Sequence, residues 1–286
     1  MDADRPFDRR LRRIRRDRAA SLRDDARYLH RRAAEELLER LDLVARPFAS
    51  ALDLGCGDGF LTAQLRSRGL AVVAADAGNA FARAAAGVQC DEDRLPFADG
   101  IFDLVVSVGV LDTVNDLPGA LALVRRALRP DGLFLAAFAG AGSLPALRQA
   151  IRAAEEADGS GPGPRIHPQI DVRAAGDLLV RAGFALPVAD SETTNVRFSS
   201  LPRLVADLRG MAATNILAAR PHQPFTRMGL AAAIAAFAAL ADADGKTAER
   251  FEIIHLSGWA PGPNQPVPAR RGSATASLAD ALKPKL

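Results

Sequence analysis

The chain has 286 residues, of which 49% are hydrophobic and 25% are charged. These fractions are typical of a globular protein and exclude an intrinsically disordered chain. Two cysteines, Cys56 and Cys90, are too few for a disulfide framework. No run of about 18 uncharged apolar residues is present, so we expect no membrane-spanning helix.

The net charge of +3 is unevenly distributed along the chain. Residues 1–32 contain 12 arginines and six aspartates, which gives this segment a charge of +6 and leaves −3 for the rest. Such a basic arm indicates either a solvated helix or a surface for nucleic acid, an acidic partner or a membrane. The aspartates argue against an organelle-targeting peptide, and no apolar signal-peptide core follows. The predicted location is therefore the cytoplasm.

Apolar periodicity in the first half of the chain predicts alternating helices and strands. A helix is expected over 24–44, because apolar residues recur there at three- and four-residue spacing. Strands are then predicted at 51–54, 70–76, 87–90, 102–107 and 133–139, with helices at 60–68, 79–86 and 117–128 and a turn at 130–132. This alternation implies βαβ units and a parallel sheet, whose ligands bind at the carboxyl ends of the strands.

The second half of the chain has a looser pattern. Helices are predicted at 143–157, 171–182, 201–210 and 225–241, extended segments at 185–198 and 250–256, a Gly/Pro-rich loop at 158–168 and a short helix at 278–282. We expect Asp171 to be an N-cap. The expected organisation is a basic arm and helix (1–46), a core (47–142), a cover (143–225), a last helix and strand (226–260) and a Pro-rich tail (261–286).

The first predicted strand runs into a Gly-rich loop. Residues 52–59 read Leu-Asp-Leu-Gly-Cys-Gly-Asp-Gly, and the loop ends at Gly59. Glycines at alternate positions permit a tight turn and close approach of a ligand to the backbone. The dinucleotide fingerprint G-x-G-x-x-G fails, because Phe60 stands where its third glycine should be. The pattern of a phosphate-binding loop, G-x-x-x-x-G-K-S/T, is not met either, since this segment contains no lysine. The loop alone is also compatible with a simple tight turn.

Acidic residues follow the next two predicted strands. Asp76 ends the second strand, 19 residues after Gly57, where a carboxylate can accept hydrogen bonds from both hydroxyls of a ribose. Asp91 follows the third strand, where a carboxylate can accept from an adenine amino group. Each has an alternative explanation, as a turn residue or as part of a solvated acidic loop. Together with the Gly-rich loop, the two carboxylates predict a nucleoside-containing ligand.

These motifs resemble the class I S-adenosylmethionine-dependent methyltransferases, of the type-11-like subgroup with LDLGCGxG, an acidic strand end and D-x-x-x-LPF. The resemblance covers about 50–140 and implies a Rossmann-like α/β fold. The implied sheet is mostly parallel and seven-stranded, with helices on both faces, an N-terminal helical arm and an α-helical cover. The cofactor implied by this resemblance is S-adenosyl-L-methionine, and the implied cofactor-binding residues are Asp53, Gly55, Cys56, Gly57, Asp76, Asp91, Glu92 and Ser107.

A narrower resemblance extends over most of the chain. Phe7-Asp8-Arg9-Arg10, Val114-Asn115-Asp116-Leu117-Pro118 and Phe251-Glu252-Ile253-Ile254-His255 are similar to segments of the bacterial relatives of a mitochondrial complex I assembly factor with a methyltransferase fold. That family is in turn similar to the malonyl carrier-protein methyltransferase of biotin synthesis. The mitochondrial relative is associated with arginine hydroxylation, so the fold does not decide the reaction.

One departure from this family lies beside the expected methyl group. Relatives usually carry Gln-Trp or His-Trp where this chain has Asp112-Thr113. An aromatic side chain beside the reactive methyl group would therefore be missing, and a carboxylate would be present. We expect Asp112 to start a helix, with a general base as the alternative.

Other candidate residues give weaker signals. The four histidines have no metal-ligand spacing, so no metal site is predicted. His255 and Trp259 are expected to pack within or at the edge of the core. Met211, Asn215 and Arg209 are expected to line the cover, and no Ser-His-Asp arrangement is present.

The leading hypothesis is methyl transfer from S-adenosylmethionine to a protein or small-molecule acceptor beneath the cover. No catalytic residue is assigned, because this transfer depends mainly on proximity and alignment. The alternative is an assembly factor for respiratory NADH dehydrogenase, acting as an arginine hydroxylase or as a non-catalytic partner of a complex subunit. A nicotinamide-dependent dehydrogenase is disfavoured by Phe60, and no nucleic-acid partner is expected.

Overall fold

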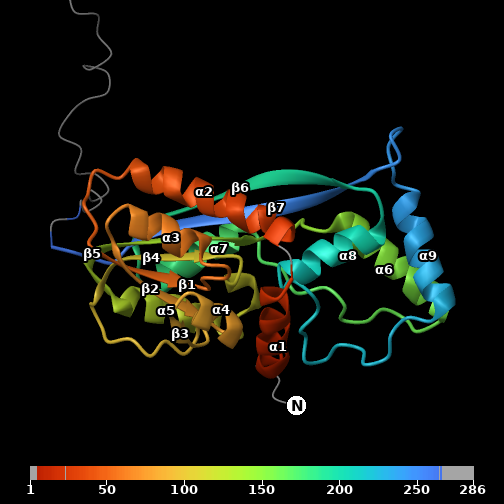
Figure 1. Ribbon diagram of the computed structural model, residues 1–286, viewed down its shortest axis with the longest axis horizontal. Coiled ribbons are helices and arrows are strands. Elements are labelled where there is room, and N and C mark those ends of the chain that lie inside the picture. Colours follow the sequence, from red (N-terminus) through yellow and green to blue (C-terminus); the bar gives the residue numbers. More distant parts are fainter. Residues whose placement is uncertain (1–4, 23, 264, 266–286) are drawn as a thin grey trace, which may run out of the picture.

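The computed structural model describes residues 5–22, 24–263 and 265. Across this part of the chain, seven strands form one open sheet in the order β3-β2-β1-β4-β5-β7-β6 (Figure 1). The strands are β1 (Ser50–Leu54), β2 (Ala71–Asp76), β3 (Val88–Gln89), β4 (Phe102–Val108), β5 (Leu128–Ala139), β6 (Ala185–Phe198) and β7 (Thr247–Trp259). Strands β1 to β5 pair in parallel, and β7 is antiparallel to both of its neighbours. The predicted mostly parallel, seven-stranded α/β sheet is confirmed.

Helices cover both faces of the sheet. The α-helices are α1 (Arg9–Ala20), α2 (Tyr28–Asp42), α3 (Phe60–Ser67), α4 (Asn79–Ala84), α5 (Leu117–Ala127), α6 (Pro145–Asp158), α7 (Val172–Arg181), α8 (Leu201–Gly210) and α9 (Arg227–Ala238). Helices α2 and α3 pack on one face of the sheet, and α5 and α7 pack on the other. Among the described residues, no helix combines the length and apolar character needed to cross a membrane.

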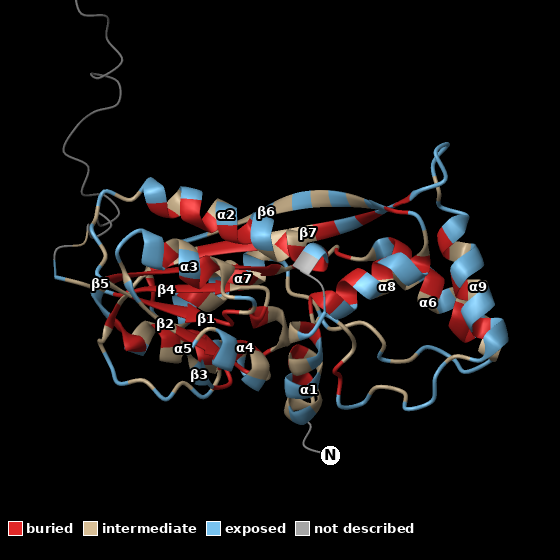
Figure 2. Cartoon of the chain, viewed as in Figure 1, coloured by how far each residue is buried: buried red, intermediate tan, exposed pale blue. Residues whose placement is uncertain are grey.

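Burial explains why the central strands are almost continuously apolar. In β1 only Ser50 is partly exposed, and Leu52 and Leu54 are fully buried. A parallel sheet that is covered on both faces requires apolar side chains at successive positions, not at alternate ones. Figure 2 shows this buried centre beneath helices whose outer surfaces are exposed.

A separate apolar cluster holds the helical cover together. Strands β6 and β7 stay paired beyond the end of β5 and extend over α6, α8 and α9 (Figure 1). At their far end, Phe198 and Phe251 pack with Leu204, Ala150 and Phe237 from these helices. The long antiparallel pair therefore attaches the cover to the core.

Several predicted element boundaries need correction. The helix expected from residue 24 begins at Tyr28, after a 3-10 turn over Asp24–Arg27. The turn expected at 130–132 lies within β5, where Asp131 has a φ of +62° and the pairing with β4 shifts register. Asp171 is confirmed as an N-cap, because its side chain accepts a hydrogen bond from the Ala174 amide. The helix predicted at 278–282 lies outside the described residues.

Burial predicts a large difference between two leucine truncations. Leu104 is fully buried in β4, whereas Leu43 is 86% exposed after α2. We expect Leu104→Ala to lower the free energy of unfolding by about 2–5 kcal/mol, because it removes apolar contacts and leaves a cavity. Leu43→Ala should change it by less than about 0.5 kcal/mol. Urea denaturation measures both, and similar losses for the two variants would contradict the packing described here.

Candidate cofactor and substrate site

The Gly-rich loop lies where the strand order reverses. Leu54, the last residue of β1, pairs in register with Ser107 of β4. Gly55 follows with a φ of +85°, and a Cβ atom there would lie 2.5 Å from Val110 Cγ2. Both the backbone angle and the space therefore require glycine. The loop is at the switch point where ligands of open α/β sheets bind.

Asp76 lies beside this loop at the end of β2 and is fully buried. Its carboxylate accepts hydrogen bonds from the amides of Gly57, at 3.0 Å, and Gly78, at 2.7 Å. It also accepts two hydrogen bonds from Arg16 of α1, one of them from Nε at 2.6 Å. Burial alone would raise the pKa of Asp76, but Arg16 and the two amides lower it overall.

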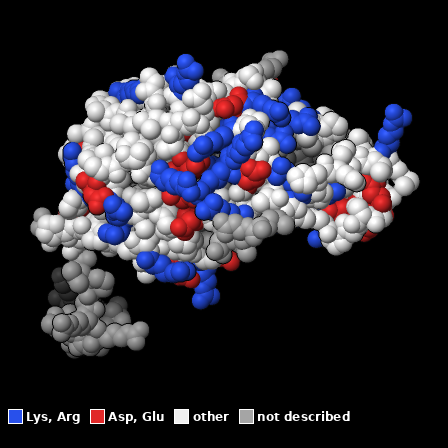
Figure 3. All heavy atoms as spheres, turned by 90° about the horizontal axis from the view of Figure 1, so that it is seen from below, with Lys and Arg blue, Asp and Glu red and all other residues white. Residues whose placement is uncertain are grey.

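Three further arginines of α1 pair with the acidic residues that follow β3. The pairs are Arg9 with Asp93, Arg12 with Glu92 and Arg13 with Asp91. The Arg12 guanidinium donates to both oxygens of Glu92, at 2.6 and 2.8 Å. Basic and acidic side chains are intermingled on the face of the molecule that Figure 3 shows from below. The predicted acidic site is thus engaged by the arginines of one helix.

The arm is therefore not simply a solvated helix. The side chains of Arg12 and Arg16 are only 6% and 8% exposed. They stand one turn apart on α1 and therefore face the same direction. The solvated-helix explanation of the basic arm is therefore wrong for the inward face of α1, and it remains valid for exposed positions such as Arg10.

The other predicted cofactor residues surround the same strand ends. Asp53 is buried in β1 and accepts a hydrogen bond from the Thr62 hydroxyl at 2.5 Å. Burial raises its pKa to about 7. Ser107 is fully buried, and within the described part of the chain its hydroxyl has no hydrogen-bond partner. Cys56 is also buried in the loop, and burial raises the pKa of its thiol.

Two hollows meet at this edge of the sheet. A narrow cleft of about 40 Å³ lies at the Gly-rich loop, and a cavity of about 210 Å³ lies between the core and the cover. Both are lined by Arg16, His30, Val108 and Met211. The shared residues show that the cleft and the cavity adjoin. This arrangement suits a cofactor and an acceptor that react with each other.

His30 is a candidate functional residue that the sequence analysis missed. Its ring packs against Gly109, where an added Cβ would lie 2.5 Å from Nε2. Burial, together with the charge of Arg16, lowers its pKa to about 4. The imidazole is therefore neutral near pH 7 and has a lone pair that can accept a proton. The only sequence signal for its burial was its place next to Leu29, which belongs with Ala33 to the apolar stripe of α2.

The cover contributes some of the residues expected from the sequence. Met211 and Asn215 line the cavity, as does His167 from the loop before α7. Arg209 is exposed at the end of α8 and is not among the lining residues, so its predicted place is wrong.

Asp112 lies in the short 3-10 helix Leu111–Thr113 and lines the same cavity. Oδ1 of its carboxylate is buried and has no hydrogen-bond partner among the described residues. Burial raises its pKa to about 6. The expected helix-start position of Asp112 is confirmed, because it lies in the first turn of this helix, and its carboxylate also lines the cavity beneath the cover.

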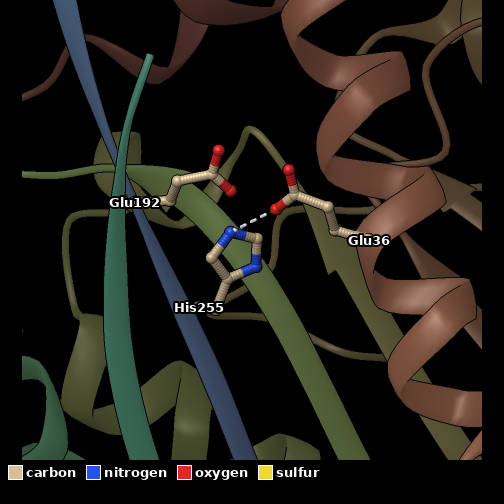
Figure 4. Close-up of side chains that lie close together, drawn as sticks. All are labelled: Glu36, Glu192 and His255. Atoms are coloured by element: carbon tan, nitrogen blue, oxygen red, sulfur yellow. Dashed lines mark ion pairs between the residues drawn. The ribbon is translucent and has the colours of Figure 1, made fainter.

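A separate polar cluster joins α2 to the antiparallel strands. Glu36 of α2 lies 2.8 Å from Nε2 of the fully buried His255 in β7, and Glu192 of β6 lies beside them (Figure 4). Arg32 forms ion pairs with both glutamates. The neighbouring Glu36 carboxylate raises the pKa of Glu192. The packed environment predicted for His255 is confirmed, and this ion-paired cluster fixes α2 against the sheet.

Comparisons with known proteins agree with this architecture. A family model described as a methyltransferase domain matches residues 52–136. The mitochondrial arginine-hydroxylase NDUFAF5 of Danio rerio is 34% identical, over 97% of this chain and 89% of the relative. The malonyl-[acyl-carrier protein] O-methyltransferase of Laribacter hongkongensis is 32% identical, over 86% of this chain and 87% of the relative. A Bacillus halodurans crystal structure titled as a methyltransferase aligns with a TM-score of 0.55 at 17% identity, covering 79% of this chain and 99% of that one.

The fold and the matched domain define a class I methyltransferase. The chain belongs to the family of S-adenosylmethionine-dependent methyltransferases that includes the NDUFAF5 arginine-hydroxylases and the malonyl-[acyl-carrier protein] O-methyltransferases. The cofactor of this class is S-adenosylmethionine.

Replacing the Asp112 carboxylate with a neutral side chain should raise the free energy of unfolding, by an amount that depends on pH. An unfolded aspartate has a pKa of about 3.9, whereas that of Asp112 is raised to about 6 in the folded chain. The folded state therefore loses stability as the pH rises from about 4 to 6, because the buried group must ionise. We expect Asp112→Asn to be more stable than the parent by up to about 3 kcal/mol at pH 8. Most of this gain should disappear at pH 4. Urea unfolding at both pH values measures it, and an equal effect at the two would contradict the burial of the charge.

Proposed function

We propose that the protein transfers a methyl group from S-adenosylmethionine to an acceptor held in the cavity beneath the cover. The observation that carries this proposal is the junction of the Gly-rich cleft with that cavity. The division into a basic arm, a cofactor-binding core at 47–142 and a cover at 143–225 belongs to the same proposal. So do the cytoplasmic location and the absence of a nucleic-acid partner.

The residues at the strand ends suit this cofactor in their chemistry. Bound S-adenosylmethionine supplies a methyl group that its sulfonium has already activated. Asp76 would accept from the ribose hydroxyls, and Asp91 with the Glu92 backbone would hold the adenine. Gly55, Cys56 and Gly57 would leave room for close backbone contact, with Asp53 and the unpartnered hydroxyl of Ser107 beside the methionine part.

Two groups are placed to receive a proton from the acceptor. His30 lines both the cleft and the cavity, but its pKa, lowered to about 4, makes it a weak base. Asp112 lines the cavity, and its pKa, raised to about 6, makes it the stronger base. The acceptor would donate its lone pair to the methyl carbon while the bond from carbon to sulfur breaks. Any proton that the acceptor loses would pass to the Asp112 carboxylate, while the neutral imidazole of His30 would accept a hydrogen bond from the acceptor.

Cofactor binding should compete with the docking of α1. Arg16 already donates to both oxygens of Asp76, and Arg12 already donates to both oxygens of Glu92. A ribose that used the Asp76 carboxylate would have to displace the Arg16 guanidinium. The measured affinity for the cofactor would therefore include the free energy of separating this buried pair.

Calorimetry with S-adenosylmethionine tests this competition. We expect Arg16→Ala to bind the cofactor at least tenfold more tightly than the parent, because no guanidinium has to leave Asp76. Asp76→Asn should lose most of the binding. Arg10→Ala removes an exposed arginine from the same helix and should leave the affinity unchanged.

Circular dichroism establishes that each variant is folded before the titration. No binding to the parent would remove the proposed function. Weaker binding to Arg16→Ala would instead make Arg16 part of the cofactor site.

A second function is favoured by the similarity to NDUFAF5 over 97% of this chain. The protein would then act on an arginine of a respiratory NADH dehydrogenase subunit, or assist assembly of the complex without catalysis. The partner would be a subunit of the complex in place of a small molecule. Asp91, Glu92 and Asp93 already pair with arginine side chains within this chain, which supports a substrate that carries a guanidinium.

Mass spectrometry of cellular proteins distinguishes the two functions. Proteins from parent and deletion strains would be compared for a modification that disappears in the deletion strain. Loss of a methyl group, nominally about 14 Da, supports methyl transfer to a protein. Loss of an added oxygen, nominally about 16 Da, supports hydroxylation and contradicts the leading proposal. Reintroduction of the parent gene is the control and should restore the modification.

A further inference from the structure

The outward face of α1 carries a second set of arginines, distinct from those that enter the cleft. Arg15 and Arg18 of α1 and Arg209 of α8 line a surface groove. Ser21, Leu22 and Thr214 complete it. Arg18 and Arg209 are exposed, and Leu22 is an apolar side chain that is 45% exposed. The groove is therefore basic, with a small apolar element.

These three arginines differ from those on the inward face of α1 in having no acidic partner. Among the residues that the structure describes, Arg15, Arg18 and Arg209 form no ion pair. The Nε atom of Arg15 is buried and has no hydrogen-bond partner in the part of the chain that the structure describes. The helix dipole explains the position of Arg18 and that of Arg209 when each is taken alone, because each lies in the last turn of its helix, where a positive charge is favourable. They do not account for the convergence of both residues on Arg15.

The groove concentrates like charge. Burial, followed by the charges of Arg18, Arg209 and Arg220, lowers the pKa of Arg15. Arg220 has an acidic neighbour, Asp8, at 3.4 Å. Like charges held together without a counterion destabilise the protein, and a bound anion relieves their repulsion. Guanidinium groups also hold carboxylates through paired hydrogen bonds.

The position of the groove connects it to the proposed site. Thr214 lines both the groove and the cavity beneath the cover. Arg209 lies in the last turn of α8, just before the segment that contributes Met211 and Asn215 to the cavity. A ligand that spans this boundary would have one end in the groove and the other in the cavity.

We propose that this arginine groove docks an acidic segment of a protein substrate, whose carboxylates pair with Arg15, Arg18 and Arg209. A neighbouring residue of the segment would then enter the cavity past Thr214. This inference rests on the proposed function for the choice of a protein acceptor. The groove itself does not depend on the reaction that follows.

Peptide binding tests the inference without requiring turnover. The probe is a fluorescently labelled eight-residue glutamate peptide, and its anisotropy is measured with the full chain in the absence of cofactor. We expect binding that weakens steeply between 50 and 300 mM salt, on the order of tenfold or more, because surface charges are screened. A glutamine peptide of equal length should not bind.

Two double variants with the same change in charge localise the site. Arg18→Gln with Arg209→Gln should weaken binding of the glutamate peptide at least tenfold. Arg173→Gln with Arg181→Gln removes two exposed arginines from α7 and should change it less than twofold. Equal losses in the two variants would overturn the inference, since the attraction would then be general.

The remaining outcomes also decide the matter. Failure of the peptide to bind the parent at 50 mM salt would overturn the inference. Tighter binding of a single-stranded RNA of equal charge, abolished by the same double variant, would assign the groove to nucleic acid and overturn it too. Neither result concerns S-adenosylmethionine, so calorimetry with the cofactor reports separately on the proposed function.

Discussion

The buried ion pair between Arg16 and Asp76 is the constraint on which the rest of this site depends. Asp76 ends β2 at the edge of the sheet where cofactor binding is proposed, and it is fully buried, so its charge requires partners there. Two backbone amides provide part of the compensation, and the Arg16 guanidinium provides the remainder. Removing one member of such a pair typically costs about 3–5 kcal/mol. The helix that carries Arg16 is consequently held against the core as long as no other ligand takes the carboxylate.

This constraint gives the two faces of α1 different roles. Its inward arginines neutralise the acidic residues at the ends of β2 and β3, while Arg15 and Arg18 remain beside Arg209 without acidic partners in the described chain. A ligand that displaced the inward face would also disturb the outward one, because both belong to one rigid helix. Binding of the cofactor and docking of an acidic segment are thus expected to be coupled.

Local sequence determined much of the fold and of the sheet edge that carries the Gly-rich loop. Near-continuous apolar strands and the Gly55–Gly59 loop predicted a buried parallel sheet with a turn at its switch point, and the structure has both. The structure also brings Asp76 and Asp91 to that edge, as the positions after β2 and β3 implied. Their role in binding the cofactor stays a prediction.

The features that could not be predicted depend on contacts between distant segments. Arg12 and Glu92 are 80 residues apart, and no periodicity indicates that they pair. His30 lies on an ordinary amphipathic helix, and its position beside Gly109 follows from the packing of α2 on the sheet. Asp112 lies at a helix start, as expected, but its place in the cavity lining could not be predicted, because the cavity lies between the core and a cover that the long β6–β7 pair attaches.

Hydrogen–deuterium exchange of α1 tests the central claim most directly. The amides of residues 9–20 would be followed in the full chain with and without saturating S-adenosylmethionine, and those of α5 would serve as the internal control. If the cofactor takes Asp76 from Arg16, exchange in α1 should accelerate when the cofactor binds while α5 is unchanged. Unchanged or slower exchange in α1 under the same saturation would show that the helix stays docked and would contradict the account.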